Sequence, residues 1–156
     1  MVSYVVTGGG RGVGRAVVER LAGEDETVSV LEFDAAALDW VAAHPAEGRI
    51  LPVIGDAADP AVAEQAATVA QAAGPLSGWV NNAAVFRDAW LHEVPPGEML
   101  ALIARNLDLV VVGSAAVVRH FCPVARALSS TSRPTRRNAR CGARSPTPPR
   151  RRRSRA

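Results

Sequence analysis

The fold of this chain is constrained most by an alternation of short apolar runs with longer segments of helical periodicity over its first 121 residues. Short apolar runs bounded by glycine, proline or acidic residues are typical of buried strands, which we expect at residues 2–7, 27–33, 49–54 and 76–80. Apolar residues that recur every three or four positions indicate helices, which we expect at residues 12–22, 35–43, 60–73 and 98–121. Strands that alternate with helices predict an α/β fold with a parallel sheet.

A glycine-rich loop, Thr7-Gly8-Gly9-Gly10-Arg11-Gly12-Val13-Gly14, joins the first expected strand to the first expected helix. Glycines let the backbone turn tightly and approach a pyrophosphate, which the free N–H groups and dipole of a helix N-terminus then stabilise. A glycine loop alone is also compatible with a plain turn. Its place after a strand and before a helix favours a dinucleotide-binding site.

The loop resembles the Thr-Gly-x-x-x-Gly-x-Gly fingerprint of the short-chain dehydrogenase/reductase (SDR) family, because Thr7, Gly8, Gly12 and Gly14 match it position by position. Three further matches follow in the family's order: Asp56 after the third strand, Asn81-Asn82-Ala83-Ala84 after the fourth, and Asn106 in the last helix. The second motif departs from the family's Asn-Asn-Ala-Gly only at Ala84. The resemblance covers roughly residues 2–121.

The resemblance implies a Rossmann-like, doubly wound parallel α/β sheet of strand order 3-2-1-4, which is incomplete in this chain. It implies NAD(P)-dependent alcohol oxidation or carbonyl reduction, a dinucleotide and a small alcohol or carbonyl compound as partners, and a homo-oligomer in the family. It assigns an adenine contact to Asp56 and a place in the catalytic proton relay to Asn106. The expected cofactor-binding residues are Thr7, Gly8, Gly10, Arg11, Gly12, Val13, Gly14, Glu32, Asp34, Asp56, Ala57, Asn82, Ala83 and Ala84.

The acidic residue at the end of the second strand selects between NAD and NADP, because a carboxylate accepts a hydrogen bond from the ribose 2′-OH and repels a 2′-phosphate. Glu32 matches this position best, and Asp34 is the second choice. Both could instead be solvated acids at a strand end. Arg11 favours NADP, since a guanidinium in the glycine loop can bind a 2′-phosphate. Because two carboxylates near this position favour NAD and one guanidinium favours NADP, we expect NAD to be the cofactor.

The charge of the chain changes abruptly near residue 122. Residues 1–122 carry 15 acidic residues and 7 arginines, a net charge of −8, whereas residues 123–156 carry 11 arginines and no acid, a net charge of +11. The segment 122–156 also holds five prolines and many serines and threonines. Such a composition cannot bury enough apolar surface to fold, so we expect two parts: a nucleotide-binding part at 1–121 and a disordered tail at 122–156.

The SDR mechanism, as the resemblance implies it, needs a serine, a tyrosine and a lysine four residues after the tyrosine. This sequence contains no lysine, and its one tyrosine is Tyr4 in the first expected strand. The chain as written is therefore expected to be inactive. If the codons of the tail are read in a frame shifted by one base, they can encode Ile-Val-Asn-Val-Ser-Ser over 129–134. The same frame can encode a tyrosine 13 positions after the second serine, and a lysine four positions after that tyrosine. We therefore expect a reading frame lost near residues 119–126.

The alternative is a non-catalytic dinucleotide-binding module whose arginine-rich tail binds nucleic acid or another acidic partner. The tail has no interleaved aromatic residues, and the negative main part would repel a phosphate backbone, so the sequence favours the first hypothesis.

Other features exclude further classes of protein. The three histidines have no ligand spacing, so we expect no metal site. Two cysteines are too few for a disulfide framework, and no basic segment precedes an apolar run at the N-terminus. The apolar stretch 107–118 is interrupted by Asp108 and is shorter than a membrane span. We expect a soluble, cytoplasmic protein.

Overall fold

The structure, a computed structural model, describes residues 1–121. The expected disordered tail, both cysteines and the serine, tyrosine and lysine positions of the shifted frame lie outside the described residues. The elements are, in order, β1 (Ser3–Thr7), α1 (Gly12–Gly23), β2 (Thr27–Glu32), the 3-10 helices η1 (Ala35–Ala43) and η2 (Glu47–Arg49), β3 (Ile50–Ile54), α2 (Pro60–Ala73), β4 (Leu76–Val80) and α3 (Pro96–Phe121). The expected elements are all present, although residues 35–43 form a 3-10 rather than an α-helix.

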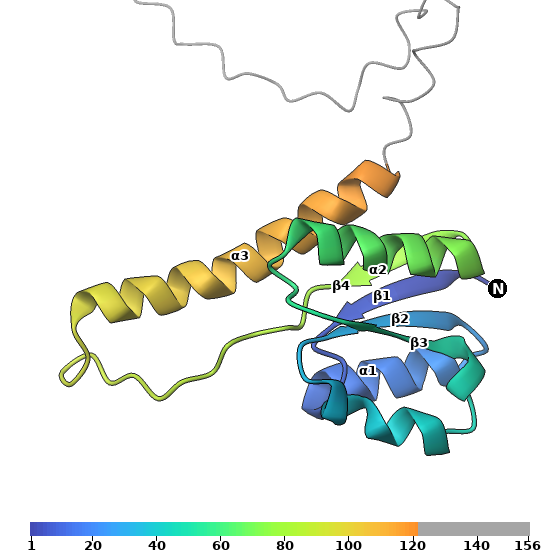
Figure 1. Ribbon diagram of the computed structural model, residues 1–156, viewed down its shortest axis with the longest axis horizontal. Coiled ribbons are helices and arrows are strands. Elements are labelled where there is room, and N and C mark those ends of the chain that lie inside the picture. The colour runs from blue at the N-terminus through green and yellow to red at the C-terminus, as the bar shows by residue number, and fades with distance from the viewer. Residues whose placement is uncertain (122–156) are drawn as a thin grey trace, which may run out of the picture. The chain divides into compact units, whose positions relative to one another are not determined.

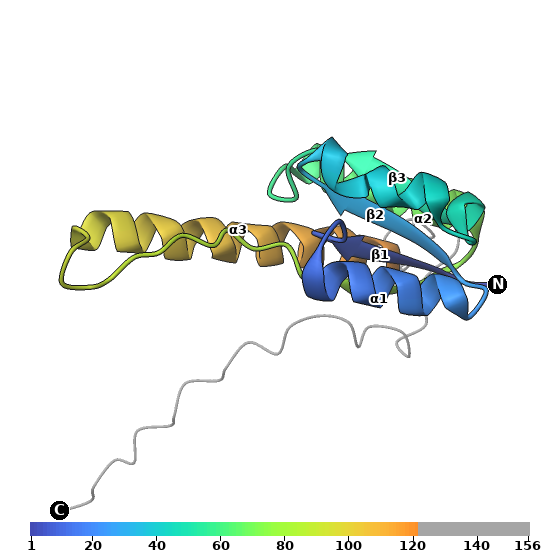
Figure 2. The same cartoon turned by 90° about the horizontal axis from the view of Figure 1, so that it is seen from below.

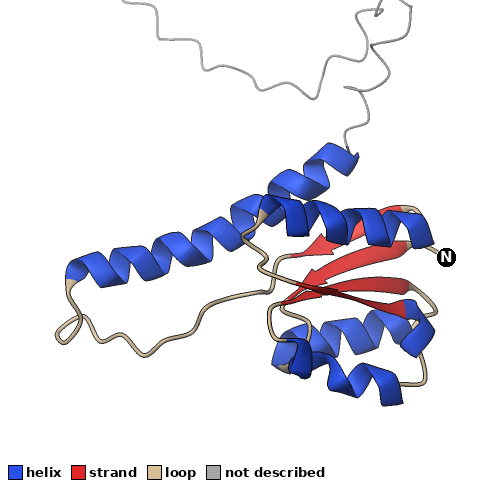
Figure 3. Ribbon diagram, in the orientation of Figure 1, coloured by secondary structure: helices blue, strands red, loops and turns tan. Residues whose placement is uncertain are grey.

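The four strands form one parallel sheet of order β3-β2-β1-β4, which confirms the expected topology (Figure 3). β1 pairs with β2 from Ser3 opposite Thr27 to Thr7 opposite Leu31. The two central strands, β1 and β2, are almost entirely buried because helices cover both of their faces, as is usual for parallel sheets. One face packs against α1 and η1, and the other against α2 and α3 (Figure 1).

Successive side chains of β1 point to opposite faces of the sheet and so enter two separate hydrophobic clusters. Val6 packs with Val18 of α1 and Leu38 of η1 in the first cluster. Val5 packs with Ala66 of α2 and Leu109 of α3 in the second. The core is built from small aliphatic side chains, and this allows the helices to approach the sheet closely.

The helix ends follow from local sequence. The Asp59 side chain caps α2 by accepting a hydrogen bond of 2.8 Å from the Ala61 N–H, and Pro60 occupies the first turn. Asp34 caps η1 in the same way, with 3.1 Å to the Ala36 N–H. In contrast, no side chain among residues 1–121 caps the N-terminus of α1, which begins inside the glycine loop. The exposed N–H groups of that turn remain available to a ligand.

Helix α3 extends beyond the sheet, and the connection 81–95 runs along its projecting half (Figures 1 and 2). Its buried residues are Leu109, Gly113 and Ala116, whereas many of its other apolar side chains are exposed. Among residues 1–121, α3 is the one helix long and apolar enough to cross a bilayer. The apolar run at 107–118 lies within this helix, which is 26 residues long. Its packing against α2 and β4 also fits the core helix of an α/β fold.

Candidate functional site

All four strands are parallel, so their carboxyl ends meet at one edge of the sheet, where ligands bind in open α/β folds. The glycine loop follows β1, Glu32 ends β2, Asp56 follows β3 and Asn82 follows β4. The structure thus brings together at this edge the residues that the sequence suggested one by one.

Two glycines of the loop have backbone conformations that other residues rarely adopt, with φ of +65° at Gly8 and +53° at Gly12. A Cβ added at Gly14 would lie 2.1 Å from the Gly8 carbonyl oxygen and 2.4 Å from Asn82 Nδ2, so only glycine fits there. A Cβ added at Gly12 would meet nothing within 4 Å. The loop is therefore tightly packed on its protein side at Gly14 and open at Gly12, beside the uncapped turn of α1. This arrangement fits an anion such as a pyrophosphate.

A set of hydrogen bonds holds the glycine loop to the end of β4. The buried Thr7 hydroxyl accepts bonds of 3.0 Å from the N–H groups of both Asn82 and Ala83, and donates to the Val80 carbonyl at 3.4 Å. Asn82 Nδ2 donates in return to the carbonyls of Thr7 at 3.2 Å and Gly8 at 2.9 Å. Thr7 and Asn82 therefore position the loop through its backbone.

We expect Thr7→Val to destabilise the chain by about 2 kcal/mol, because the isosteric valine leaves two backbone N–H groups without an acceptor. Thr68→Val is the matched control, since Thr68 is exposed on α2 and, within the described part of the chain, bonds only the Glu64 carbonyl. Urea unfolding followed by circular dichroism measures both. Equal stability of the two variants would contradict a positioning role for the Thr7 hydroxyl.

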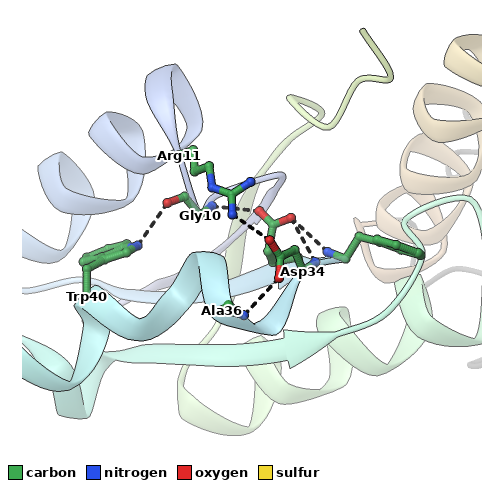
Figure 4. A network of polar contacts seen from close by, with 7 residues as sticks. Gly10, Arg11, Asp34, Ala36 and Trp40 are labelled. Atoms are coloured by element: carbon green, nitrogen blue, oxygen red, sulfur yellow. Dashed lines mark hydrogen bonds and ion pairs between the residues drawn. The ribbon is translucent and has the colours of Figure 1, made fainter. Parts of the chain in front are cut away.

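The acidic residues at the end of β2 and just after it form a network with the glycine loop (Figure 4). Glu32 Oε2 accepts a bond of 2.9 Å from the Gly10 N–H, and Oε1 accepts one of 3.0 Å from the Phe33 N–H. Asp34 forms an ion pair of 2.6 Å with Arg11, in which both side chains are well exposed. The Glu32 carboxylate is thus fixed against the loop backbone, while Asp34 holds the one guanidinium of the loop.

Trp40 supports the glycine loop from η1. Its Nε1–H donates to the Gly10 carbonyl at 3.2 Å (Figure 4). The Arg15 guanidinium lies over its ring at 4.5 Å from the centroid. The sequence shows no signal for this contact, because residues 10 and 40 are joined only by the packing of η1 against the loop.

A pocket of about 310 Å³ opens between the ends of β2 and β3 and the side of α3. It is lined by Gly8, Leu31, Glu32, Phe33, Gly55, Asp56, Ala57, Ala83, Ala84, Val85, Arg105 and Leu109. Asp56 Oδ1 accepts a bond of 2.9 Å from the Ala58 N–H, and Oδ2 is ion-paired with Arg105 of α3. The Ala58 N–H first, and then the Arg105 guanidinium, hold the pKa of Asp56 below its ordinary value. Arg105 was not identified from the sequence.

Asn106 lies on α3 with its amide fully engaged. Its Oδ1 accepts a bond of 2.9 Å from the Val85 N–H, and its Nδ2 donates to the carbonyls of Val85 at 3.1 Å and Leu102 at 3.0 Å. In the described part of the chain, Asn106 thus fastens the connection 81–95 to α3. The role in a proton relay that the resemblance implies stays a prediction.

No residue within 1–121 is placed to act as the catalytic tyrosine of the family mechanism. Tyr4 lies within β1, three residues before its carboxyl end, with its ring against Gly78. Residues 1–121 also bring together no group of three or more metal-ligating side chains. The described site is therefore suited to binding and orienting a ligand, without an evident proton donor.

A parallel 3-2-1-4 sheet with a glycine loop at its carboxyl edge defines the Rossmann-type class of α/β proteins. Residues 3–128 match the family model of the short chain dehydrogenases, and the chain belongs to this family. It is 32% identical over 105 residues to the 3-oxoacyl-(acyl-carrier-protein) reductase MabA of Mycobacterium avium, a match that covers 67% of this chain and 38% of that reductase.

Two crystal structures show the same fold. A blue fluorescent protein from a metagenomic library, in complex with NADPH, is 30% identical with a TM-score of 0.61 over 74% of this chain and 49% of that one. A 3-ketoacyl-(acyl-carrier-protein) reductase from Brucella melitensis, complexed with NADH, is 23% identical with a TM-score of 0.68 over 81% of this chain and 52% of that one. The chain thus spans about half or less of the length of these relatives.

Proposed function

We propose that this chain is the cofactor-binding part of an SDR oxidoreductase that transfers hydride between a nicotinamide dinucleotide and a small alcohol or carbonyl compound. The proposal rests chiefly on the glycine loop, which is packed at Gly14, open at Gly12 and fastened to β4 through Thr7 and Asn82. The loop and the uncapped turn of α1 would hold the pyrophosphate, and the pocket beside Asp56 would hold the adenine. The bound dinucleotide would supply the hydride chemistry. We place the protein in the cytoplasm, without a membrane partner.

The first test is binding. The full chain, titrated with NADH and followed by the fluorescence of the nicotinamide, should bind with a 1:1 stoichiometry. Arg20→Ala is a control that should bind equally, since Arg20 pairs with Glu24 at the far end of α1. A chain that shows the expected helix and strand content by circular dichroism but binds neither NADH nor NADPH would contradict the proposal.

We further propose that NAD is preferred to NADP. Glu32 is held in place by two backbone N–H groups, so its carboxylate is preorganised to accept a bond from the ribose 2′-OH and to repel a 2′-phosphate. Arg11 is the guanidinium that would favour NADP, and its ion pair with Asp34 competes with that role.

Glu32→Ala is expected to reduce the selectivity for NAD over NADP by about 1–3 kcal/mol, the scale of a hydrogen bond to a charged group. Asp39→Ala is the matched control, because it removes the same charge from η1 without a described contact to the loop. The ratio of NAD to NADP dissociation constants measures the effect. An unchanged ratio in Glu32→Ala would remove Glu32 from the assignment, and a shift in Asp34→Ala alone would give the role to Asp34.

The second candidate is the non-catalytic module, which the net charge of +11 in residues 123–156 favours. Such a tail should bind duplex DNA with an affinity that falls steeply between low and physiological salt. Fluorescence anisotropy with a labelled duplex would detect it, and a chain that binds NADH but not DNA at low salt would leave only the oxidoreductase hypothesis.

A further inference from the structure

Among the residues that the structure describes, Arg105 is the one cation that lines the pocket beside Asp56, and it belongs to none of the motifs that the sequence suggested. It lies on α3 directly before Asn106, 49 positions from Asp56 in the chain, and its Nη2 is ion-paired with Asp56 Oδ2. The side chains of Arg105 and Asp56 are 42% and 33% exposed. A pair this accessible to solvent adds little to stability, so structural support alone does not account for it.

Asp56 does not need the guanidinium to hold its orientation. Its other oxygen already accepts the Ala58 N–H, which fixes the carboxyl group at the start of the loop before α2. The ion pair instead fixes Arg105. It places a planar cation, which would otherwise be flexible, among the apolar lining residues Leu31, Val85 and Leu109. A planar guanidinium held by a carboxylate is well suited to stack on a nucleobase.

We propose that Arg105 forms a wall of the adenine site and stacks its guanidinium plane on the adenine ring, with Asp56 anchoring the guanidinium and facing the edge of the base. The inference rests on the proposed function, because it concerns the same dinucleotide. A carboxylate has about four acceptor positions, so Asp56 can bond Ala58, Arg105 and the adenine amino group together. Arg105 is thereby a specificity-determining residue for the adenine half of the cofactor.

The test uses the full chain and two probes, ADP and NADH, with dissociation constants from isothermal titration. Arg105→Lys keeps the charge and can keep the ion pair, but it removes the planar group. Arg105→Met keeps the length and removes both. Each variant is expected to bind ADP about tenfold more weakly than the unaltered chain, through loss of the stacking surface. Arg87→Lys and Arg87→Met are matched controls, since Arg87 forms a similar exposed pair with Glu98 but does not line the pocket.

The outcomes are distinguishable. Weaker ADP binding in the Arg105 variants, with unchanged binding in the Arg87 variants, supports the inference. Unaltered ADP affinity in either folded Arg105 variant overturns it, as does equal weakening in the Arg87 variants, which would indicate a long-range charge effect. Loss of folding in both Arg105 variants would assign the residue a structural role and also overturn it. If the unaltered chain binds neither ADP nor NADH, the proposed function itself fails.

Discussion

Gly14→Ala is expected to destabilise this chain by about 3 kcal/mol, although alanine normally stabilises a helix relative to glycine. The reason is that the added Cβ would lie 2.1 Å from the Gly8 carbonyl oxygen, a backbone atom that cannot move without opening the loop. It would also lie 2.4 Å from Asn82 Nδ2 and displace the bonds that fasten the loop to β4. NADH binding should be lost together with stability.

Gly12 and Gly23, at the two ends of α1, serve as controls. Gly12→Ala meets open space, so its cost is the strain of φ +53°, about 1 kcal/mol. Gly23→Ala at the end of α1 also meets nothing within 4 Å and has no left-handed φ, so it should be neutral or slightly stabilising. Urea unfolding of the three variants gives the order. A Gly14→Ala chain as stable as Gly12→Ala would show that the loop does not pack against Gly14 as described.

The second large effect concerns activity. The chain as written should show no NAD(P)-linked turnover, because none of its 156 residues is a lysine and its one tyrosine, Tyr4, lies within β1. A gene whose frame is restored near the codons for residues 119–126 should encode Ser-Ser and then Tyr-x-x-x-Lys, and its product should turn over an alcohol or carbonyl substrate. The family match ends at residue 128, close to this interval.

The physical reason is proton transfer. Hydride transfer to a carbonyl needs a matched proton donor, and a nearby lysine and the positive charge of the nicotinamide lower the pKa of a tyrosine toward neutrality. Turnover in the frame-restored protein, measured by NADH absorbance, should be lost again when the restored tyrosine is replaced by phenylalanine, with cofactor affinity kept. If no single shift of the gene's frame encodes the tyrosine and lysine, the frame hypothesis is wrong and the arginine-rich segment needs its own explanation.

Local sequence was sufficient for the elements of the fold. Several features determine the local structure over only a few residues: the apolar runs at β1 and β2, Asp59 and Pro60 at the start of α2, and the glycines after β1. Their effect depends on steric limits and nearby hydrogen bonds, so it can be read without the tertiary structure. The strand order 3-2-1-4 came instead from the family resemblance, and the structure confirms it.

Local sequence was insufficient where a contact joins distant segments. The support of Gly10 by Trp40 was missed because it depends on how η1 packs under the loop.

By itself, then, the sequence determined the alternating α/β pattern, the glycine loop and the residues at the strand ends, since these depend on short-range backbone preferences. Only the tertiary structure decided which of those residues share a site and what completes it. Three contacts of the site join residues that lie from 22 to 76 positions apart in the chain. They are the hydrogen bond from Gly10 to the Glu32 carboxylate, the bonds from Asn82 and Ala83 to the Thr7 hydroxyl, and the ion pair of Arg105 with Asp56. Such contacts form when parallel strands bring their carboxyl ends to one edge, because the packing of helices on both faces, and not the local sequence, sets the distances between them.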